Sequence, residues 1–433
     1  MDNDMEMLET LQSQTFNYFL TYVNPANGLI ADKSDPDSHS SIAVVGLGIS
    51  SYVAAIERNL LSRNEATHKI LTVLDFFYSG HQGTEPDAMG YKGFYYHFLH
   101  MDTGKRAWES ELSTIDTAIF IAGVLTAASY FQGKNKEEQK IRELADGLYR
   151  RVDWQWALNN NATICHGWKP ESGFLANYWD QGYSEAIILY ILALGSPTFP
   201  IEPDGYLQWT STFAWDKIDG IEYIHAGPLF IHQMSHLWLD FRGIQDDLNR
   251  KYKIDYFENS RRATHIQQQY AIRNPRNFKH YSKNNWGFTA SDGPGPAIVM
   301  IDGEEKIFYD YIARGVPFGP DDGTISPWAV VASLPFAPDI VMGTIRHAIQ
   351  KLKQNNVSKE GFDASFNPLF VMAESKKNGW VSPWKFGLNE GPMVIMIENF
   401  LTQLIWNLFK KSGYITHGLR RAGFRGGWLD ESN

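Results

Sequence analysis

Two kinds of helical pattern alternate along this chain of 433 residues. In the first kind, apolar residues recur every three or four positions and charged residues fill the other side, which predicts helices with one face in water. These segments are residues 7–22, 64–79, 137–158 and 338–353, with a weaker candidate at 204–218. The second kind is apolar on nearly every side, which predicts helices buried all round. These segments are residues 41–56, 118–128, 186–194, 329–336 and 393–409, and more weakly 229–241.

The alternation of buried and amphipathic helices predicts a double ring. Buried helices would form the inner ring and amphipathic helices the outer ring, with about six of each, as in an (α/α)6 barrel. An irregular helical array or solenoid is the alternative, but no clean repeat period is present. Because no low-complexity linker divides the chain, we expect a single all-α domain over residues 1–433.

Long loops separate some of these helices. Residues 160–182, 276–327 and 354–388 are rich in Gly, Pro, Asn and Trp. Residues 94–99 and 107–108, joined by a turn at 102–105, predict a small β-hairpin. Loops this long in a compact domain commonly carry function, so we expect them at the active-site face.

Composition excludes several classes of protein. The formal net charge is −10 and no long basic run is present, which argues against nucleic acid as a partner. The single cysteine, Cys165, excludes a disulfide within the chain. No stretch of about 20 apolar residues is present, so no membrane span is expected. The first residues contain no apolar signal-peptide core. We expect a periplasmic or secreted monomer whose leader is absent from this chain, and the cytoplasm remains an alternative.

Aromatic residues are abundant, with 14 Trp, 21 Tyr and 26 Phe. Several tryptophans fall in the predicted loops, where an indole ring could stack on the C–H face of a sugar. Packing in a large core is the alternative interpretation. The loop tryptophans are Trp168, Trp179, Trp286, Trp328, Trp380 and Trp384.

Carboxylates recur next to the buried helices. Hydrolysis of a glycosidic bond uses two carboxyl groups, one on each side of the bond. Glu109, Glu111 and Asp116 lie just before or at the start of the buried segment 118–128. Ser113 and Asp116 also fit a helix cap. Glu185 precedes the uncharged segment 186–194, so we expect it at the mouth of the barrel, where aromatic neighbours would raise its pKa.

Three further acids are candidates with plain structural alternatives. Asp292 and Asp322 lie in Asp-Gly turns, and Glu390 lies in the first turn of a helix, where an acid is favoured anyway. The spacing of His232 and His236 lacks the glutamate of a zinc-binding HExxH motif, which indicates a packed face. No metal or other cofactor is expected.

Several motifs occur together in order along the chain: SELSTIDT at 110–117, GYSEA at 182–186, LALGSPT at 192–198, FENSRRAT at 257–264, TASDGP at 289–294, EGP at 390–392 and MIEN at 396–399. On these motifs the chain resembles the bacterial glycoamylase-like ("glucoamylase") family, which is related to the family 144 β-1,2-glucan hydrolases. The resemblance covers nearly the whole chain. It implies an (α/α)6 barrel, no obligatory cofactor, a β-glucan substrate and inversion at the anomeric carbon.

The resemblance also assigns roles to residues. The glutamate of the Gly-Tyr-x-Glu motif maps to Glu185, the expected general acid. The base is expected among Glu109, Glu111 and Asp116, with Asp292 and Glu390 in reserve. Ser113 stands where an aspartate would be expected. The expected substrate-binding residues are Asp292, Glu390, Trp179, Trp286, Tyr183, Arg261, Asp322 and Trp384.

The expected function is therefore a glycoside hydrolase that acts on a β-linked glucan, with β-1,2-glucan or its oligosaccharides as the substrate. A transglycosylase or a polysaccharide lyase on the same barrel is one alternative. A glycan-binding protein without turnover is another.

Overall fold

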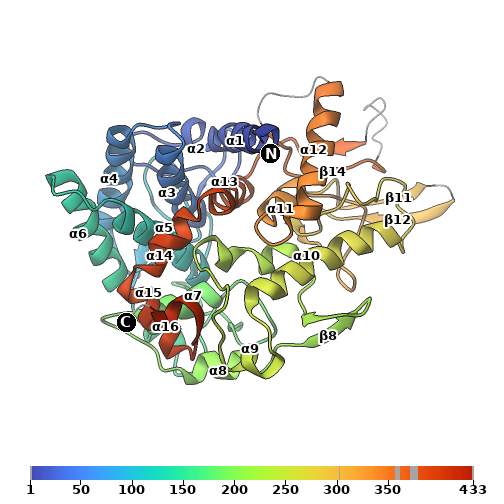
Figure 1. Ribbon diagram of the computed structural model, residues 1–433. Helices are drawn as coiled ribbons and strands as arrows, with labels where there is room; N and C mark the ends of the chain where they lie inside the picture. The colour runs from blue at the N-terminus through green and yellow to red at the C-terminus, as the bar shows by residue number, and fades with distance from the viewer. Residues whose placement is uncertain (1, 302, 356–360, 371–378, 432–433) are drawn as a thin grey trace.

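The computed structural model describes residues 2–301, 303–355, 361–370 and 379–431. Six helical segments from successive parts of the chain form an inner ring (Figure 1). The inner segments are α3 (Ile42–Glu57), α5 (Thr114–Tyr130), α7 (Ile187–Gly195), the 3-10 pair η2 (Leu229–His232) and η3 (Met234–Leu237), α11 (Pro327–Ala332) and α13 (Gly387–Leu401). Each segment packs beside the next, and α13 closes the ring by packing on both α11 and α3.

An outer layer alternates with the inner ring along the chain. It consists of α1 (Asp2–Phe16), α4 (Arg63–Ser79), α6 (Lys136–Arg150), α8 (Asp204–Thr210), α10 (Tyr256–Arg273) and α12 (Pro338–Asn355). The remaining helices are α2 (Tyr18–Thr21), η1 (Trp156–Leu158), α9 (Asp247–Tyr252), α14 (Leu404–Lys410), α15 (Gly413–Arg421) and α16 (Gly427–Glu431). The predicted all-helical double ring is confirmed. None of the described helices combines the length and apolar character that a bilayer crossing needs.

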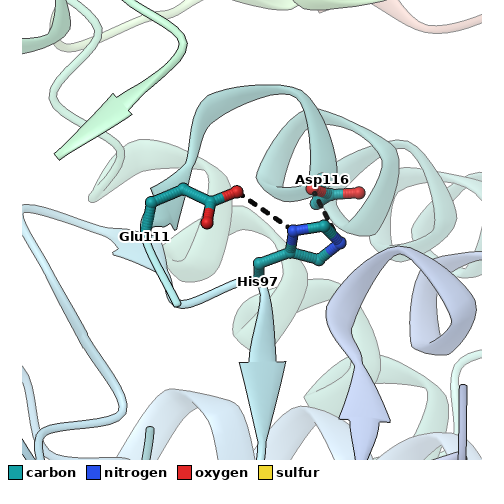
Figure 2. A group of neighbouring side chains, drawn as sticks. All are labelled: His97, Glu111 and Asp116. Atoms are coloured by element: carbon teal, nitrogen blue, oxygen red, sulfur yellow. Dashed lines mark hydrogen bonds and ion pairs between the residues drawn. The ribbon is translucent and has the colours of Figure 1, made fainter. Parts of the chain in front are cut away.

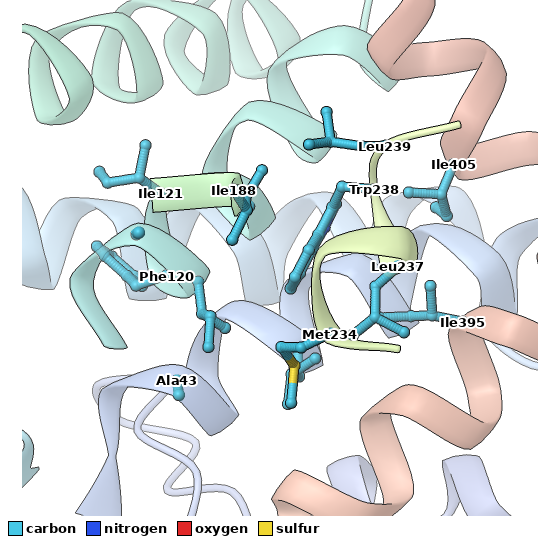
Figure 3. Close-up of a cluster of buried hydrophobic side chains, with 14 of the residues drawn as sticks. Ala43, Phe120, Ile121, Ile188, Met234, Leu237, Trp238, Leu239, Ile395 and Ile405 are labelled. Carbon is cyan, nitrogen blue, oxygen red and sulfur yellow. The ribbon is translucent and has the colours of Figure 1, made fainter. Parts of the chain in front are cut away.

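The sequence explains which helix lies in which ring. Every residue of α7 is buried, whereas α6 buries Ile141, Leu144 and Leu148 and leaves its charged residues other than Glu138 at least partly exposed. Side chains from four inner segments meet at the centre, among them Phe120, Ile188, Trp238 and Ile395, as Figure 3 shows. The indole Nε1 of Trp238 donates to Ser50 Oγ at 3.0 Å, so this core tryptophan leaves no buried donor unsatisfied.

The strands are short and lie at the loops. They are β1 (Ser40–Ser41), β2 (Gly90–Tyr91), β3 (Phe94–Tyr95), β4 (Phe98–Leu99), β5 (Leu112–Ser113), β6 (Gly167–Lys169), β7 (Gly173–Phe174), β8 (Trp215–Ile218), β9 (Ile221–Ile224), β10 (Ala290–Ser291), β11 (Ala297–Ile301), β12 (Glu304–Phe308), β13 (Ile312–Ala313), β14 (Phe366–Asn367) and β15 (Trp380–Val381). β1 leads directly into α3 and β5 into α5, so these strands mark one end of the ring.

The predicted hairpin forms in part. Leu99 pairs with Arg106, and the backbone N–H of Ala107 donates to the carbonyl of Phe98 at 2.9 Å, so the predicted turn is present. Phe94 instead pairs with Tyr91, and β4 pairs with β1 on its other side. The pairing of β4 with β1 could not be predicted from the local sequence, because the two strands lie more than 50 residues apart in the chain.

Four helix predictions had the wrong extent. Residues 229–241 form 3-10 turns, where Gln233 and Ser235 bond to carbonyls of neighbouring inner segments. The candidate at 204–218 ends at Thr210, and its last residues form β8. The segment 393–409 breaks after α13, where Gln403 has a φ of 61°, and the segment 137–158 ends at Arg150. The outer helix α10 was not among the predicted ranges.

The closest helix contact in the inner ring joins α3 to α5. A Cβ atom added at Gly123 would overlap the backbone of Gly46, and one added at Gly46 would lie 2.5 Å from the carbonyl oxygen of Ile119. The two backbones therefore touch without intervening side chains.

Gly123→Ala is expected to destabilise the fold by about 1–3 kcal/mol, because backbone rather than a flexible side chain must move to make room. The free energy of unfolding measured with urea tests this expectation. Gly413→Ala is the matched control, since Gly413 starts α15 and its added Cβ would have nothing within 4 Å. Equal stability of the two variants would contradict the close contact.

Candidate active site

Acidic side chains gather at the end of the ring where β1 and β5 enter the inner helices. Asp116 lies in the first turn of α5, where Ser113 caps the helix by accepting from the N–H of Asp116 at 3.2 Å. Glu111 lies just before β5, and Glu185 lies two residues before α7. The predicted capping role of Ser113 is confirmed. Because helix N-termini carry partial positive charge, this end of the ring favours anions.

His97 lies between two of these carboxylates, as Figure 2 shows. Its Nδ1 is 3.0 Å from Glu111 Oε1 and its Nε2 is 3.6 Å from Asp116 Oδ2. Ser113 Oγ donates to the same Oδ2 atom of Asp116. Since each ring nitrogen faces a carboxylate, the arrangement is that of an imidazolium with both N–H groups directed at anions.

The charges of this cluster support that protonation state. Burial alone would lower the pKa of His97, but the carboxylates of Asp116, Glu111 and Asp32 outweigh burial and raise it to about 9. Burial likewise opposes ionisation of Glu111, but the hydrogen bond and charge of His97 lower the pKa of its carboxyl. Glu111 is therefore ionised and His97 protonated at neutral pH.

Glu185 has the opposite character. Burial and, secondarily, the negative charge of Asp116 raise the pKa of Glu185 to about 7, although its side chain remains partly exposed. Its backbone carbonyl accepts a hydrogen bond from Ser235 Oγ at 2.7 Å, which ties the residue to the neighbouring inner segment. A carboxyl that holds its proton near pH 7 and remains accessible can act as a general acid.

The site contains three residues that the sequence did not single out: Asp32, His97 and Tyr311. Burial first, and then the nearby charge of Asp116, raise the pKa of Asp32 to about 6. The residue Tyr311 is 51% exposed. The pKa of its hydroxyl is raised by burial as the largest cause, and next by the carboxylates of Asp32, Asp292 and Asp116. Asp32 could have been found as an acid upstream of the first buried helix, whereas no local pattern marked His97 or Tyr311.

Three predicted substrate-binding residues are partly exposed. Asp292, whose charge reaches Tyr311, accepts from Ser382 Oγ at 2.7 Å. The ammonium group of Lys33, the residue after Asp32, lies 5.6 Å from the ring centre of Trp384. Trp179 stacks on His166 at 3.9 Å and donates from Nε1 to Thr114 Oγ1 at 3.1 Å. Their contact with substrate remains a prediction.

The side chains of four other residues that were predicted to contact substrate have partners elsewhere in the structure. Trp286 is 1% exposed and donates to Thr344 from the core. Asp322 is buried in a two-point ion pair with Arg314 at 2.8 Å. Tyr183 is buried and its ring stacks on Tyr256. Arg261 lies on the outer helix α10 and pairs with Glu258.

Two predicted acids also lie outside the cluster. Glu109 is exposed beside Trp108 and, among the residues that the structure describes, makes no hydrogen bond or ion pair with His97, Asp116 or Glu185. Glu390 is 1% exposed, and neither of its carboxyl oxygens has a hydrogen-bond partner in the described structure. Burial, against the opposing charge of Lys385, raises the pKa of Glu390 to about 8. Glu390 is therefore a buried neutral acid, and sugar cannot reach it in this conformation.

Within the part of the chain that the structure describes, the group of side chains that could hold a metal is the His97 cluster. One ligand atom from each of His97, Glu111 and Asp116 lies within 4.8 Å of the others. The ring nitrogens of His97 already face the two carboxylates, so the group is an ion-pair network. His232 and His236 are buried and bond to Ala226 O and Ser260 Oγ, which agrees with their predicted packing role.

Comparisons with known proteins place the chain in a family. A family model described as "Putative glucoamylase" (Glycoamylase) matches residues 177–413. A curated relative from Parabacteroides distasonis, an exo β-1,2-glucooligosaccharide sophorohydrolase (non-reducing end), is 29% identical over 96% of this chain. The chain spans 58% of that relative's length.

Solved structures agree with the fold. A protein from Bacteroides uniformis that carries the same family description has a TM-score of 0.85 and 29% identity, over 99% of both chains. A β-1,2-glucanase from Parabacteroides distasonis has a TM-score of 0.82 and 26% identity, over 97% of this chain and 60% of its own. The family model matches more than half of this chain, so the chain belongs to the glycoamylase family.

Proposed function

We propose that this protein is a glycoside hydrolase that cleaves β-1,2-glucan or its oligosaccharides. The observation that carries the proposal is the contrast between two acids at this end of the ring. Burial raises the pKa of the accessible Glu185 to about 7, whereas His97, which also faces Asp116, keeps Glu111 ionised. Glycosidic hydrolysis requires one carboxylic acid and one carboxylate. The β-1,2 linkage rests on the sophorohydrolase and the β-1,2-glucanase to which the chain is similar.

Glu185 is the proposed general acid. Its proton passes to the glycosidic oxygen as the bond to the anomeric carbon breaks. Because burial raises the pKa of Glu185 to about 7, a substantial fraction of the carboxyl still carries this proton at neutral pH. The proposal agrees with the prediction from the Gly-Tyr-x-Glu motif.

Asp116 is the proposed general base, which takes a proton from the water that attacks the anomeric carbon. Its contacts with Ser113 and His97 both use Oδ2, which leaves Oδ1 for water in the described structure. Asp116 is also the acid whose charge raises the pKa of Glu185, which Glu111 does not do. Glu111 and His97 act as positioning residues that hold Asp116 in place.

A lyase or a transglycosylase would leave different products. A lyase makes an unsaturated sugar that absorbs in the ultraviolet, and a transglycosylase makes longer chains. A general acid beside a carboxylate favours glycosyl transfer over elimination, and the chain length of the products separates hydrolysis from transglycosylation.

Wild-type protein is expected to release short oligosaccharides from linear β-1,2-glucan, with no unsaturated product and no activity on starch. Glu185→Gln is expected to lose about 10²- to 10⁴-fold in kcat, because the amide cannot donate a proton to the leaving oxygen. Product analysis by chromatography on a panel of glucans tests both expectations. Cleavage of another glucan alone would reject the linkage, and an active Glu185→Gln would reject the acid.

The pH profile follows from the protonation of Glu185. Because the acid must carry its proton, kcat/KM is expected to fall as pH rises through about 7, the raised pKa of Glu185. His97 stays charged until about pH 9, so it does not cause this fall. Rates measured from pH 4 to 10 on a β-1,2-linked oligosaccharide test this. A profile flat up to pH 9 would contradict the assignment of Glu185.

Asp116→Asn is expected to lose hydrolysis by a similar factor, and sodium azide is expected to restore turnover as a glycosyl azide, because azide needs no base. The anomer that the wild type first releases from its substrate, read by NMR, reports the stereochemical course. Asp292→Asn is the matched control, since Asp292 also lies at this end of the ring and is bonded to Ser382. Azide rescue of Asp292→Asn instead would move the base to that residue.

A further inference from the structure

Trp108 is the most exposed tryptophan of the chain. All 14 tryptophans lie in the described residues, and 13 of them are buried or partly buried. Trp108 alone is largely exposed, at 66%. An exposed indole gives up the free energy of burial that its large apolar surface could provide, so the position requires a physical explanation.

The surrounding structure holds this side chain in one place. The ring of His39 lies 4.4 Å from the indole centre and the ring of Phe98 lies 5.1 Å from it. On the N-terminal side, buried Ala107 is hydrogen-bonded to the backbone of Phe98 at 2.9 Å. On the C-terminal side, Ser110 Oγ donates to the carbonyl of Ala107 at 2.9 Å. The indole thus contacts two neighbouring rings and its backbone is tied down on both sides, while most of its surface faces solvent.

The backbone of Trp108 is also unusual. Its φ is 53°, in the left-handed region that non-glycine residues seldom adopt. A glycine or asparagine would occupy this conformation at lower cost. Solvent exposure and backbone conformation therefore both disfavour a tryptophan at position 108. The indole is not packed in the described hydrophobic core, so burial does not offset this cost.

The location of Trp108 connects it to the proposed chemistry. Phe98, which contacts Trp108, stacks on His97 with 4.0 Å between ring centres and 13° between planes. Two successive ring contacts therefore lead from Trp108 to the imidazole that binds Glu111 and Asp116. The two contacts place the ring centres of Trp108 and His97 within about 9 Å of each other, so a glucan cut beside Asp116 can reach Trp108 with a neighbouring glucose.

We propose that Trp108 is the stacking platform of an outer glucose subsite, which binds a sugar unit separated from the scissile bond. The C–H face of the sugar would cover the exposed indole and remove its apolar surface from water. This inference rests on the proposed hydrolysis of β-1,2-glucan. It adds a chain-length preference: oligosaccharides long enough to reach Trp108 bind more tightly than shorter ones.

The test measures kcat and KM of the full chain on β-1,2-linked glucooligosaccharides of increasing length, from the shortest that is cleaved to about seven units. Trp108→Ala is expected to raise KM about tenfold for the long oligosaccharides. Their kcat, and both constants for the shortest substrate, should stay unchanged, because the subsite lies away from the reacting bond. Trp108→Phe should restore most of the affinity.

Tyr78→Ala is the matched control, since Tyr78 is 46% exposed on the outer helix α4 and is not part of the site. It should leave all constants as in the wild type. A KM that does not change in Trp108→Ala, or that changes by one factor at every chain length, would overturn the inference and leave the hydrolase proposal standing. A wild type that cleaves no β-1,2-linked oligosaccharide would reject the proposed function, and the outer subsite with it.

Discussion

The charge of His97 is the interaction on which the candidate site depends. Asp32, Glu111, Asp116 and Glu185 lie at one end of the ring, and four carboxylates this close together could not all remain ionised at neutral pH without a cation. His97 supplies one positive charge between Glu111 and Asp116, at 3.0 and 3.6 Å. Glu111 is thereby kept ionised. Glu185 has no such cation beside it among the described residues, and burial together with the charge of Asp116 raises its pKa to about 7. One imidazolium thus divides the acids into two protonation states.

The fold brings these groups together through the entry strands of the inner ring. His97 precedes β4, which pairs with β1 at the start of α3, and Asp116 lies in the first turn of α5. The close packing of α3 against α5 through Gly46 and Gly123 fixes the separation of the two helices. The distance between His97 and Asp116 is therefore set by helix packing as well as by the loops, and a rigid scaffold of this kind preorganises an active site.

The sequence predicted the double ring because burial on every side leaves a direct mark in composition, as in α7, where each residue is buried. It failed at 229–241, because side chains such as Gln233 and Ser235 bond to other inner segments and tertiary contacts decide the local backbone there. Glu111, Asp116 and Glu185 were predictable, because each lies next to the start of a buried helix. His97 was not, since strand pairing and not sequence proximity brings it to Asp116.

Loop composition was a poorer guide than helix starts, for a physical reason. Trp286 and Asp322 occur in segments that look like exposed turns, yet each has a buried partner far along the chain, Thr344 for the indole and Arg314 for the carboxylate. A loop residue can satisfy its polar group inside the protein or at the surface, and the local sequence is the same in both cases. An acid at the start of an apolar inner helix has the same two choices. Glu185 remains partly exposed before α7, whereas Glu390 is buried in the first turn of α13. The helix that follows such an acid therefore places its backbone at one end of the ring, and tertiary contacts decide whether its side chain meets solvent.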